Sequence, residues 1–106
     1  MTKEIDIQNK IRHTLPLHNC VVYRGNVGKV KLKDGRWFDT GLPKGFPDLF
    51  GFRKSDGKMF FIEVKNEKGK RSEQQVKFGE FLSRMPVLYG VARNVEEALE
   101  IVKEED

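Results

Sequence analysis

The sequence predicts a mixed α/β fold in which helices pack on a central sheet. Short apolar runs separated by glycine-rich turns are typical of strands, and three further stretches carry helical spacing or helix-capping signals. Their order along the chain is α-β-β-β-β-β-α-β-α, a hairpin-rich first half followed by a strand–helix–strand unit. We expect the 106 residues to form a single domain, residues 1–106, because chains of this length rarely contain two.

The first element is a helix. Ile7, Ile11 and Leu15 recur at helical spacing. Thr2 is a possible N-cap, and Pro16 cannot continue a helix, so we expect the helix to run from Thr2 to about Leu15.

Five strands follow before the second helix. Each is a short apolar or β-branched run bounded by glycine, proline or Asn/Asp turns. They are expected over residues 20–23, on both sides of the turn Lys33-Asp34-Gly35 within 30–38, over 48–52 and over 58–64.

Two capping signals organise the last third of the chain. Ser72 and Gln75 match a capping box that opens a helix through about Arg84. A strand is expected over 86–92, and Asn94 with Glu97 predicts the start of a final helix.

Composition excludes several classes of protein. With 38% hydrophobic and 34% charged residues, the chain can bury a modest core, and no apolar run approaches the roughly 20 residues that span a bilayer. The charged N-terminus lacks the apolar core of a secretory signal, and a single cysteine, Cys20, cannot build a disulfide framework. We therefore expect a cytoplasmic protein that does not contact membranes.

Charge is unevenly distributed along the chain. The net charge is +4, but residues 24–36 and 53–77 are basic, whereas the chain from Glu96 onward is acidic. A basic middle favours a polyanionic partner such as nucleic acid, with plain solvation of lysine-rich faces as the alternative. Arg24, Lys29 and Lys31 are the candidate DNA contacts in the first basic stretch.

Two acids border apolar strands that are expected to pair. Asp48 precedes one strand and Glu63 ends the other, and Lys65 shares a strand face with Glu63 because side chains alternate with period two. If the hairpin places Asp48 beside Glu63, their repulsion is best relieved by a divalent cation with oxygen ligands. The carbonyl of Val64 could complete the coordination.

Such a sparse site suits a nuclease. Mg²⁺ binds through one or two carboxylates plus substrate phosphate, and Lys65 would orient the attacking water and neutralise charge that develops on the phosphate. The alternative is an exposed strand face on which Glu63 and Lys65 are simply solvated. Unpaired acids beside buried strands would be costly, which favours the metal site.

Two further residues fit the same site, and each has an ordinary helix-end explanation. Glu4 lies on the helix face of Ile7 and Ile11, yet an acid in a first turn is favoured by the helix dipole alone. Gln75 begins the helix beside the Glu63 strand, yet it also completes the capping box. Gln74 is a weaker candidate.

The roles of the other polar and aromatic residues are interpreted from the residues around them in the sequence. Basic residues just before the second helix predict a phosphate-binding patch made of Lys68, Lys70 and Arg71. His13 and His18 lack partners at ligand spacing, and Cys20 is interpreted as a small buried apolar residue. Trp37 and Tyr23 could stack on bases, with core or dimer contacts as the alternative.

Three segments together resemble the VRR-NUC domain, the virus-type replication-repair nuclease branch of the PD-(D/E)xK superfamily. They are Lys44-Gly45-Phe46-Pro47-Asp48-Leu49-Phe50-Gly51, Phe61-Ile62-Glu63-Val64-Lys65 and Arg71-Ser72-Glu73-Gln74-Gln75. The resemblance implies a restriction-endonuclease-like core with Mg²⁺ or Mn²⁺ as cofactor. It implies Asp48 and Glu63 as metal ligands, Lys65 as the catalytic lysine, Gln75 in the active site and Glu4 as a helix-borne acid. Lys44 is expected to contact DNA.

The resemblance also implies a biological setting. Stand-alone members of this length, typical of phages and bacteria, resemble Holliday-junction resolvases, so we expect a homodimeric DNA endonuclease that acts on branched DNA in repair, in a bacterium or a phage-infected cell. A two-fold pair would present two active sites to a symmetric four-way junction. Two alternatives stay open: a sequence-specific restriction-type nuclease, and a non-catalytic nucleic-acid-binding module.

Overall fold

The protein is described by a computed structural model that covers residues 1–104. In chain order, the helices and strands are α1 (Glu4–Thr14), a 3-10 helix η1 (Leu15–His18), β1 (Cys20–Arg24), β2 (Lys29–Lys31), β3 (Trp37–Asp39), β4 (Leu49–Arg53), β5 (Met59–Val64), α2 (Glu73–Ser83), β6 (Leu88–Ala92) and α3 (Val95–Val102). Apart from η1, this is the predicted order of elements.

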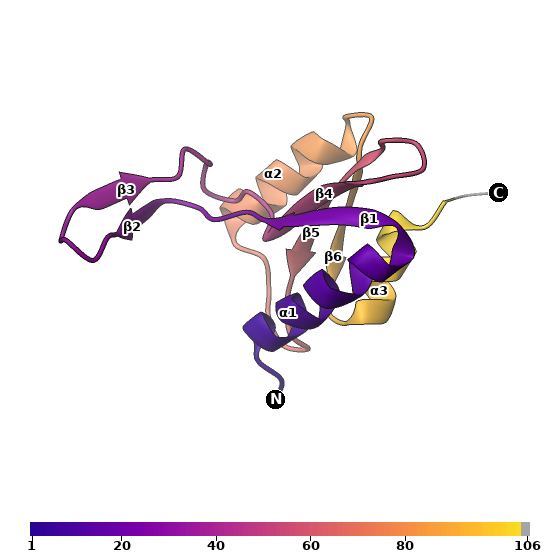
Figure 1. The fold of residues 1–106 in the computed structure, drawn as a ribbon, viewed down its shortest axis with the longest axis horizontal. Helices are drawn as coiled ribbons and strands as arrows, with labels where there is room; N and C mark the ends of the chain where they lie inside the picture. The colour runs from indigo at the N-terminus through magenta and orange to yellow at the C-terminus, as the bar shows by residue number, and fades with distance from the viewer. Residues whose placement is uncertain (105–106) are drawn as a thin grey trace.

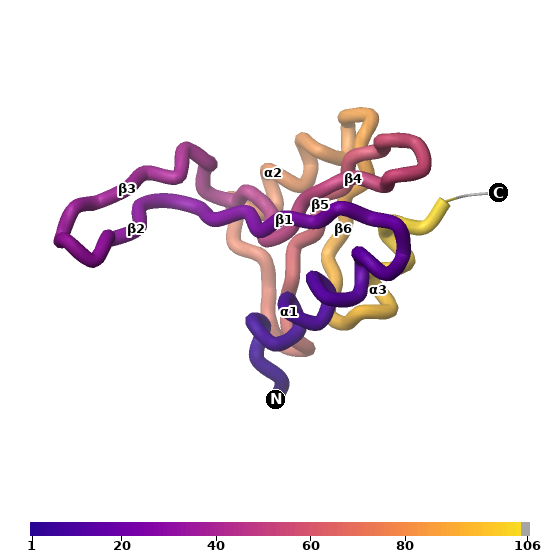
Figure 2. Tube along the Cα trace, in the orientation of Figure 1, coloured from indigo at the N-terminus to yellow at the C-terminus, as the bar shows by residue number. Residues whose placement is uncertain are grey.

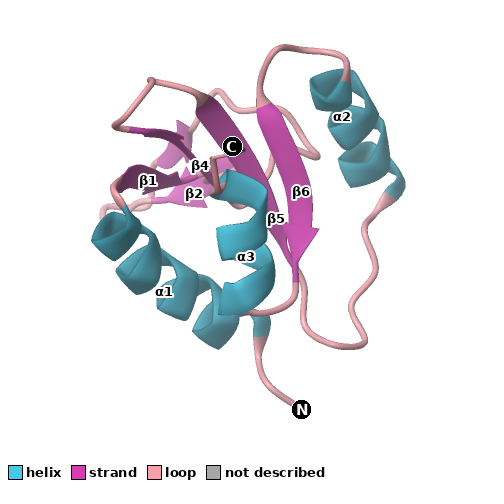
Figure 3. Cartoon of the chain, turned by 90° about the vertical axis from the view of Figure 1, so that its right-hand side faces the viewer, coloured by secondary structure: helices cyan, strands magenta, loops and turns pink. Residues whose placement is uncertain are grey.

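Four strands form a central mixed sheet in the order β1-β4-β5-β6. The pairs β1–β4 and β4–β5 are antiparallel, whereas β5 and β6, joined through α2, are parallel. Figure 3 shows α1 and α3 on one side of this sheet and α2 on the other. The chain therefore has the mixed α/β architecture that was predicted, consistent with a nuclease-like fold.

The two faces of β5 bury different sets of side chains. Phe60, Ile62 and Val64 are fully buried in a core to which α1 and α3 contribute, including Ile11 and Ala98. Residues on the other face alternate with these and point toward α2. This alternation places Glu63 on the α2 side of the sheet.

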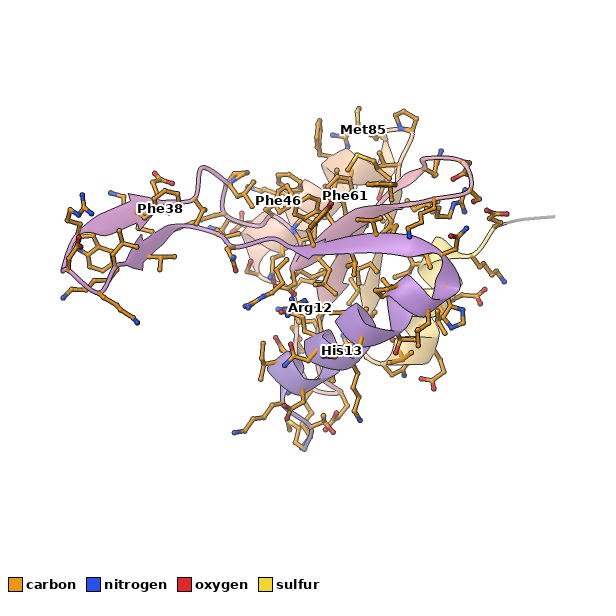
Figure 4. All side chains as sticks on the ribbon, in the orientation of Figure 1. Arg12, His13, Phe38, Phe46, Phe61 and Met85 are labelled. Atoms are coloured by element: carbon orange, nitrogen blue, oxygen red, sulfur yellow. The ribbon has the colours of Figure 1, made fainter. Side chains whose placement is uncertain are left out.

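An aromatic cluster fills the α2 side. The ring of Phe46, in the loop before β4, packs edge-on against those of Phe50, Phe61 and Phe78, with centroids 5.4 to 5.9 Å apart. Figure 4 shows Phe46 beside Phe61 near the centre of the molecule. Because Phe46 lies only two residues before Asp48, this cluster anchors the segment that carries the first acid.

The strands β2 and β3 form a separate two-stranded sheet that projects from the body (Figures 1 and 2). The hairpin turns at Lys33-Asp34-Gly35 as predicted, with Gly35 at a positive φ of 89°. All residues from Lys29 to Asp39 are exposed. The suggestion that Trp37 fills a core is therefore wrong, since its exposed fraction is 64%.

The first helix ends where it was predicted, near Leu15, but its N-cap was wrongly predicted. Lys3, not Thr2, is the N-cap residue, and it makes no side-chain capping bond because lysine has no acceptor. Acids at Glu4 and Asp6 instead lie at the positive end of the helix dipole. The α-helix ends at Thr14, and Pro16 lies in the first turn of η1, where its missing N–H is tolerated.

No helix among residues 1–104 is both long and apolar enough to cross a lipid bilayer. The last two acids of the C-terminal stretch, Glu105 and Asp106, lie outside the described residues.

Candidate active site

The ends of β4 and β5 bring two carboxyl groups together. Leu49 pairs with Ile62, so one step further along the same antiparallel register Asp48 faces Glu63. Asp48 Oδ2 accepts a hydrogen bond of 2.8 Å from the backbone N–H of Val64, which fixes the orientation of this carboxyl group. We call Asp48 and Glu63 the acid pair.

Glu63 is an unusual residue because its side chain is fully buried. Its Oε1 atom accepts a hydrogen bond of 3.1 Å from Nε2 of Gln75. Its Oε2 atom is buried and has no hydrogen-bond donor within residues 1–104. A buried carboxylate oxygen without a donor is costly, so this position favours an added proton or a cation.

The electrostatics of Glu63 agree with that reading. Burial raises the pKa of Glu63 to about 9, and the neighbouring Asp48 carboxyl group acts in the same direction. Lys65 opposes this rise, and Glu4 adds a smaller upward effect on the pKa. Without a cation, Glu63 therefore holds a proton near neutral pH.

Gln75 combines two roles that the sequence had left as alternatives. The hydroxyl oxygen of Ser72 accepts from the backbone N–H of Gln75 at 3.2 Å, and Gln75 Oε1 accepts from the backbone N–H of Ser72 at 2.7 Å. This is the predicted capping box, and it leaves the Nε2 group of Gln75 free to donate to Glu63. The helix cap therefore aims the amide at the acid pair.

Lys65 and Glu4 lie at the edge of the same site. Lys65 follows β5 and is 9% exposed. A Cβ atom built on Gly69 would lie 2.7 Å from Glu4 Oε2 and 3.3 Å from Lys65 Cδ, so both side chains flank this glycine. The structure thus brings the Glu4 carboxyl group close to Lys65, from a helix on the other side of the sheet.

Few acidic side chains among the described residues are close enough to the acid pair to help hold a divalent cation. Within residues 1–104, no three Asp, Glu, His or Cys side chains are gathered closely enough to surround a metal ion. Mg²⁺, however, needs only one or two carboxylates and keeps several waters. The acid pair, with the donor-free Oε2 atom of Glu63, fits such an ion.

A cavity of about 390 Å³ opens beside Asp48. It is lined by Gln8, Arg24, Gly25, Asn26, Val27, Lys44, Gly45, Phe46, Asp48, Ser72, Gln74 and Gln75. Sequence reasoning missed Gln8, whose Oε1 atom is buried without a partner among the described residues. Its position one turn after Glu4 on the same helix could have indicated it.

The basic candidates are divided among three places. Lys44 and Arg24 line the cavity, whereas Lys29 and Lys31 are on the projecting hairpin. Lys68 and Lys70 are exposed on either side of Gly69, next to Lys65. Arg71 is exposed and donates to the Tyr89 hydroxyl at 3.2 Å.

The remaining candidates have structural explanations. Cys20 is 3% exposed in the core, as expected, and burial raises the pKa of its thiol. His13 and His18 are exposed.

Comparison with known proteins gives one match. The family model of the VRR-NUC domain matches residues 2–96, most of the chain and every element of the candidate site. No curated protein and no solved structure is significantly similar to the chain.

Proposed function

Since the chain belongs to the VRR-NUC domain family, a family of nucleases, we propose that it is a divalent-metal-dependent endonuclease that hydrolyses phosphodiester bonds in branched DNA. One observation carries the proposal: the Glu63 carboxyl group is fully buried opposite Asp48, with an oxygen that no protein donor reaches. Burial of an acid in this way lowers the stability of the fold. A function that needs a cation at this point explains why the acid is buried there.

The acid pair would hold Mg²⁺ or Mn²⁺, with the Val64 carbonyl and the Glu4 carboxyl group as further oxygen donors. When bound, such an ion polarises a phosphate oxygen and lowers the pKa of a bound water. The 2.8 Å bond from Val64 and the 3.1 Å bond from Gln75 hold the two carboxyl groups in place for it. Gln75 is thus a positioning residue for Glu63.

Lys65 is the proposed catalytic lysine. It shares a strand face with Glu63, and its positive charge lowers the pKa of that acid, which supports a place for its ammonium group beside the acid pair. There it would orient the attacking water and offset negative charge that develops on the phosphate.

The proposed substrate is branched DNA such as a four-way junction. Lys44, Lys68, Lys70 and Arg71 would contact phosphates around the cut, which gives affinity without sequence information. We further propose that the protein acts as a homodimer, because two sites related by a two-fold axis match a symmetric junction. DNA shape, rather than base sequence, would then select the substrate.

The test is cleavage of labelled four-way junction, flap, linear duplex and single-stranded DNA, with Mg²⁺, Mn²⁺ or EDTA. Glu63→Gln keeps the size of the side chain and removes its charge. Glu67→Gln is the matched control, because Glu67 is exposed four residues further along. We expect paired, metal-dependent nicks in the junction with the wild type and the control, and none with Glu63→Gln.

Other results would point elsewhere. A fixed cut in linear duplex would indicate a restriction-type nuclease. Binding without any cleavage, together with no metal effect on thermal stability, would indicate a non-catalytic module. A metal ion at 100 times its dissociation constant should stabilise the wild type by about 2.7 kcal/mol, and this gain should be absent in Glu63→Gln.

A further inference from the structure

The hairpin of residues 29–39, hereafter the ribbon, pairs with no strand of the main sheet within residues 1–104. It forms a two-stranded sheet of its own at one end of the long axis of a molecule measuring 50 × 32 × 27 Å (Figures 1 and 2). An isolated two-stranded hairpin is marginally stable in water. Trp37 and Phe38 are nevertheless 64% and 55% exposed, so each face of the ribbon presents an aromatic ring to solvent.

The ribbon has two chemically different faces. Cross-strand partners share a face, so Lys31 lies with Trp37, whereas Val30 lies with Phe38 on the opposite side. Lys29 belongs to the Trp37 face by alternation. One face therefore offers two ammonium groups and a flat aromatic ring, with Asp39 opposite Lys29.

The charge of the ribbon favours a polyanion. It carries four basic residues, Lys29, Lys31, Lys33 and Arg36, against two acids. Both acids are engaged within the hairpin and its base: Asp34 binds Arg36 at 2.7 Å, and Asp39 accepts from the backbone N–H of Gly41 at 2.8 Å. The acidic helix α3 lies at the other end of the molecule (Figure 1).

The ribbon also continues directly from the candidate site. The segment Arg24–Val27, which leads into it, lines the 390 Å³ cavity together with Lys44, Asp48 and Gln75. A nucleic acid with a phosphate in this cavity would therefore extend along the ribbon. A partner protein would gain nothing from this continuity.

We propose that the ribbon is a DNA-binding arm that lies in the major groove of the duplex flanking the cut, with Lys29 and Lys31 on phosphates and Trp37 against the DNA. This rests on the proposed function for its choice of DNA. The major groove, about 12 Å wide, admits a two-stranded ribbon. Lys33, at the hairpin turn, is six positions beyond Val27, the last residue of this segment to line the cavity. At about 3.3 Å per residue the arm reaches roughly 20 Å, or about six base pairs, beyond the cavity.

Trp37 is the only tryptophan in the sequence, so its fluorescence reports on the ribbon alone. The Glu63→Gln variant is titrated with a four-way junction whose arms have 20 base pairs, while the anisotropy of a label on the DNA follows binding. We expect a saturable, salt-sensitive change in Trp37 emission that parallels the anisotropy. Bound DNA with unchanged emission would overturn the proposal. A change that follows protein concentration without DNA would overturn it too, because a second copy would then cover the ribbon.

The second test removes charge. Lys29→Ala/Lys31→Ala should reduce the slope of log affinity against log salt by about two, because each lysine on a phosphate contributes about one. The matched control is Lys54→Ala/Lys58→Ala, which removes two lysines from the turn between β4 and β5 at the opposite end of the molecule (Figure 1). Equal slopes for the two variants would contradict the proposal.

These tests separate the arm from the nuclease activity. A Trp37 response without cleavage by the wild type would remove the proposed function and keep the arm. Metal-dependent cleavage without a Trp37 response, and with equal slopes for the two lysine pairs, would remove the arm and keep the function.

Discussion

The candidate site and the ribbon are built on opposite principles, although both depend on charged residues. At the site, Glu63 is fully buried and Lys65 is 9% exposed, and hydrogen bonds from Val64 and Gln75 orient the acids. In the ribbon, every residue from Lys29 to Asp39 is exposed. Burial of the charged groups at the site costs free energy of folding. The charged side chains of the ribbon are solvated and can change position.

This difference suggests a division of labour. Chemistry needs groups held in a defined geometry, and only a packed body can hold them. Association with DNA needs many weak phosphate contacts and tolerates movement of the side chains. Variants in the two regions should therefore differ in kind: those in the body change stability and rate, and those in the ribbon change affinity.

The largest expected difference between the two regions is in the free energy of unfolding. It can be measured with one phenylalanine from each region. Phe60 is fully buried and Phe38 is 55% exposed. Phe60→Ala should lower the free energy of unfolding by about 3–5 kcal/mol, because it leaves a cavity in the core. Phe38→Ala should change it by less than about 0.5 kcal/mol. Urea unfolding measures both, and Phe60→Leu serves if the alanine variant does not fold. Equal losses would mean that the ribbon is part of the core.

The next effect is on the cleavage rate. Lys65→Met keeps the length of the aliphatic side chain and removes the ammonium group. We expect the rate to fall by about 10²–10³-fold, the usual loss when one group that stabilises developing charge is removed. DNA affinity should stay within about threefold of the wild type, because one phosphate-directed charge among many is lost. The exposed Lys54→Met is the control, and a Lys65→Met protein that cuts at the normal rate would exclude the assigned role.

A smaller effect concerns the stability of the metal-free protein as pH changes. The pKa of Glu63 is about 9 in the folded chain, against an ordinary 4.5. Between these two pH values Glu63 is protonated in the folded state and ionised in the unfolded state. The free energy of unfolding therefore falls as pH rises. In EDTA, Glu63→Gln should therefore be more stable than the wild type at pH 9, by at least about 1 kcal/mol or 4 °C in melting temperature.

The comparison that tests this effect is between the two proteins at each pH. Their difference in melting temperature should shrink as pH falls toward 5, because near its ordinary pKa of 4.5 Glu63 becomes protonated in the unfolded state as well, and ionisation no longer favours unfolding. A difference that does not depend on pH would contradict the raised pKa. Glu67→Gln, at an exposed position, should follow the wild type throughout.

The smallest effect separates the two roles of Gln75. Ser72→Ala removes the capping hydroxyl and should cost about 1 kcal/mol of stability, with the cleavage rate unchanged. Gln75→Ala should cost a similar amount and also slow cleavage, because the bond to Glu63 is lost. Thermal melts and single-turnover cleavage measure the two quantities. If Ser72→Ala slows cleavage as much as Gln75→Ala does, the amide acts only through the helix cap.

Much of the fold could be predicted because its signals are local. The hairpin turn at Gly35, the capping box of Ser72 and Gln75, and the helix start at Asn94 each depend on neighbours in the chain. The Thr2 cap was wrongly predicted for the same reason. A possible cap residue is a weak signal, and the helix is capped one residue later, at Lys3.

The sequence by itself determined the order of the elements and the residue types of the acid pair, since turn chemistry and strand alternation bring Asp48 opposite Glu63 across one hairpin. Tertiary structure decided the rest. It left the ribbon outside the main sheet, turned Gln8 toward the cavity, and set the N-terminal turn of α2 so that Gln75 reaches Glu63. These outcomes depend on contacts between residues far apart in the chain, whose energies no local pattern of residues records.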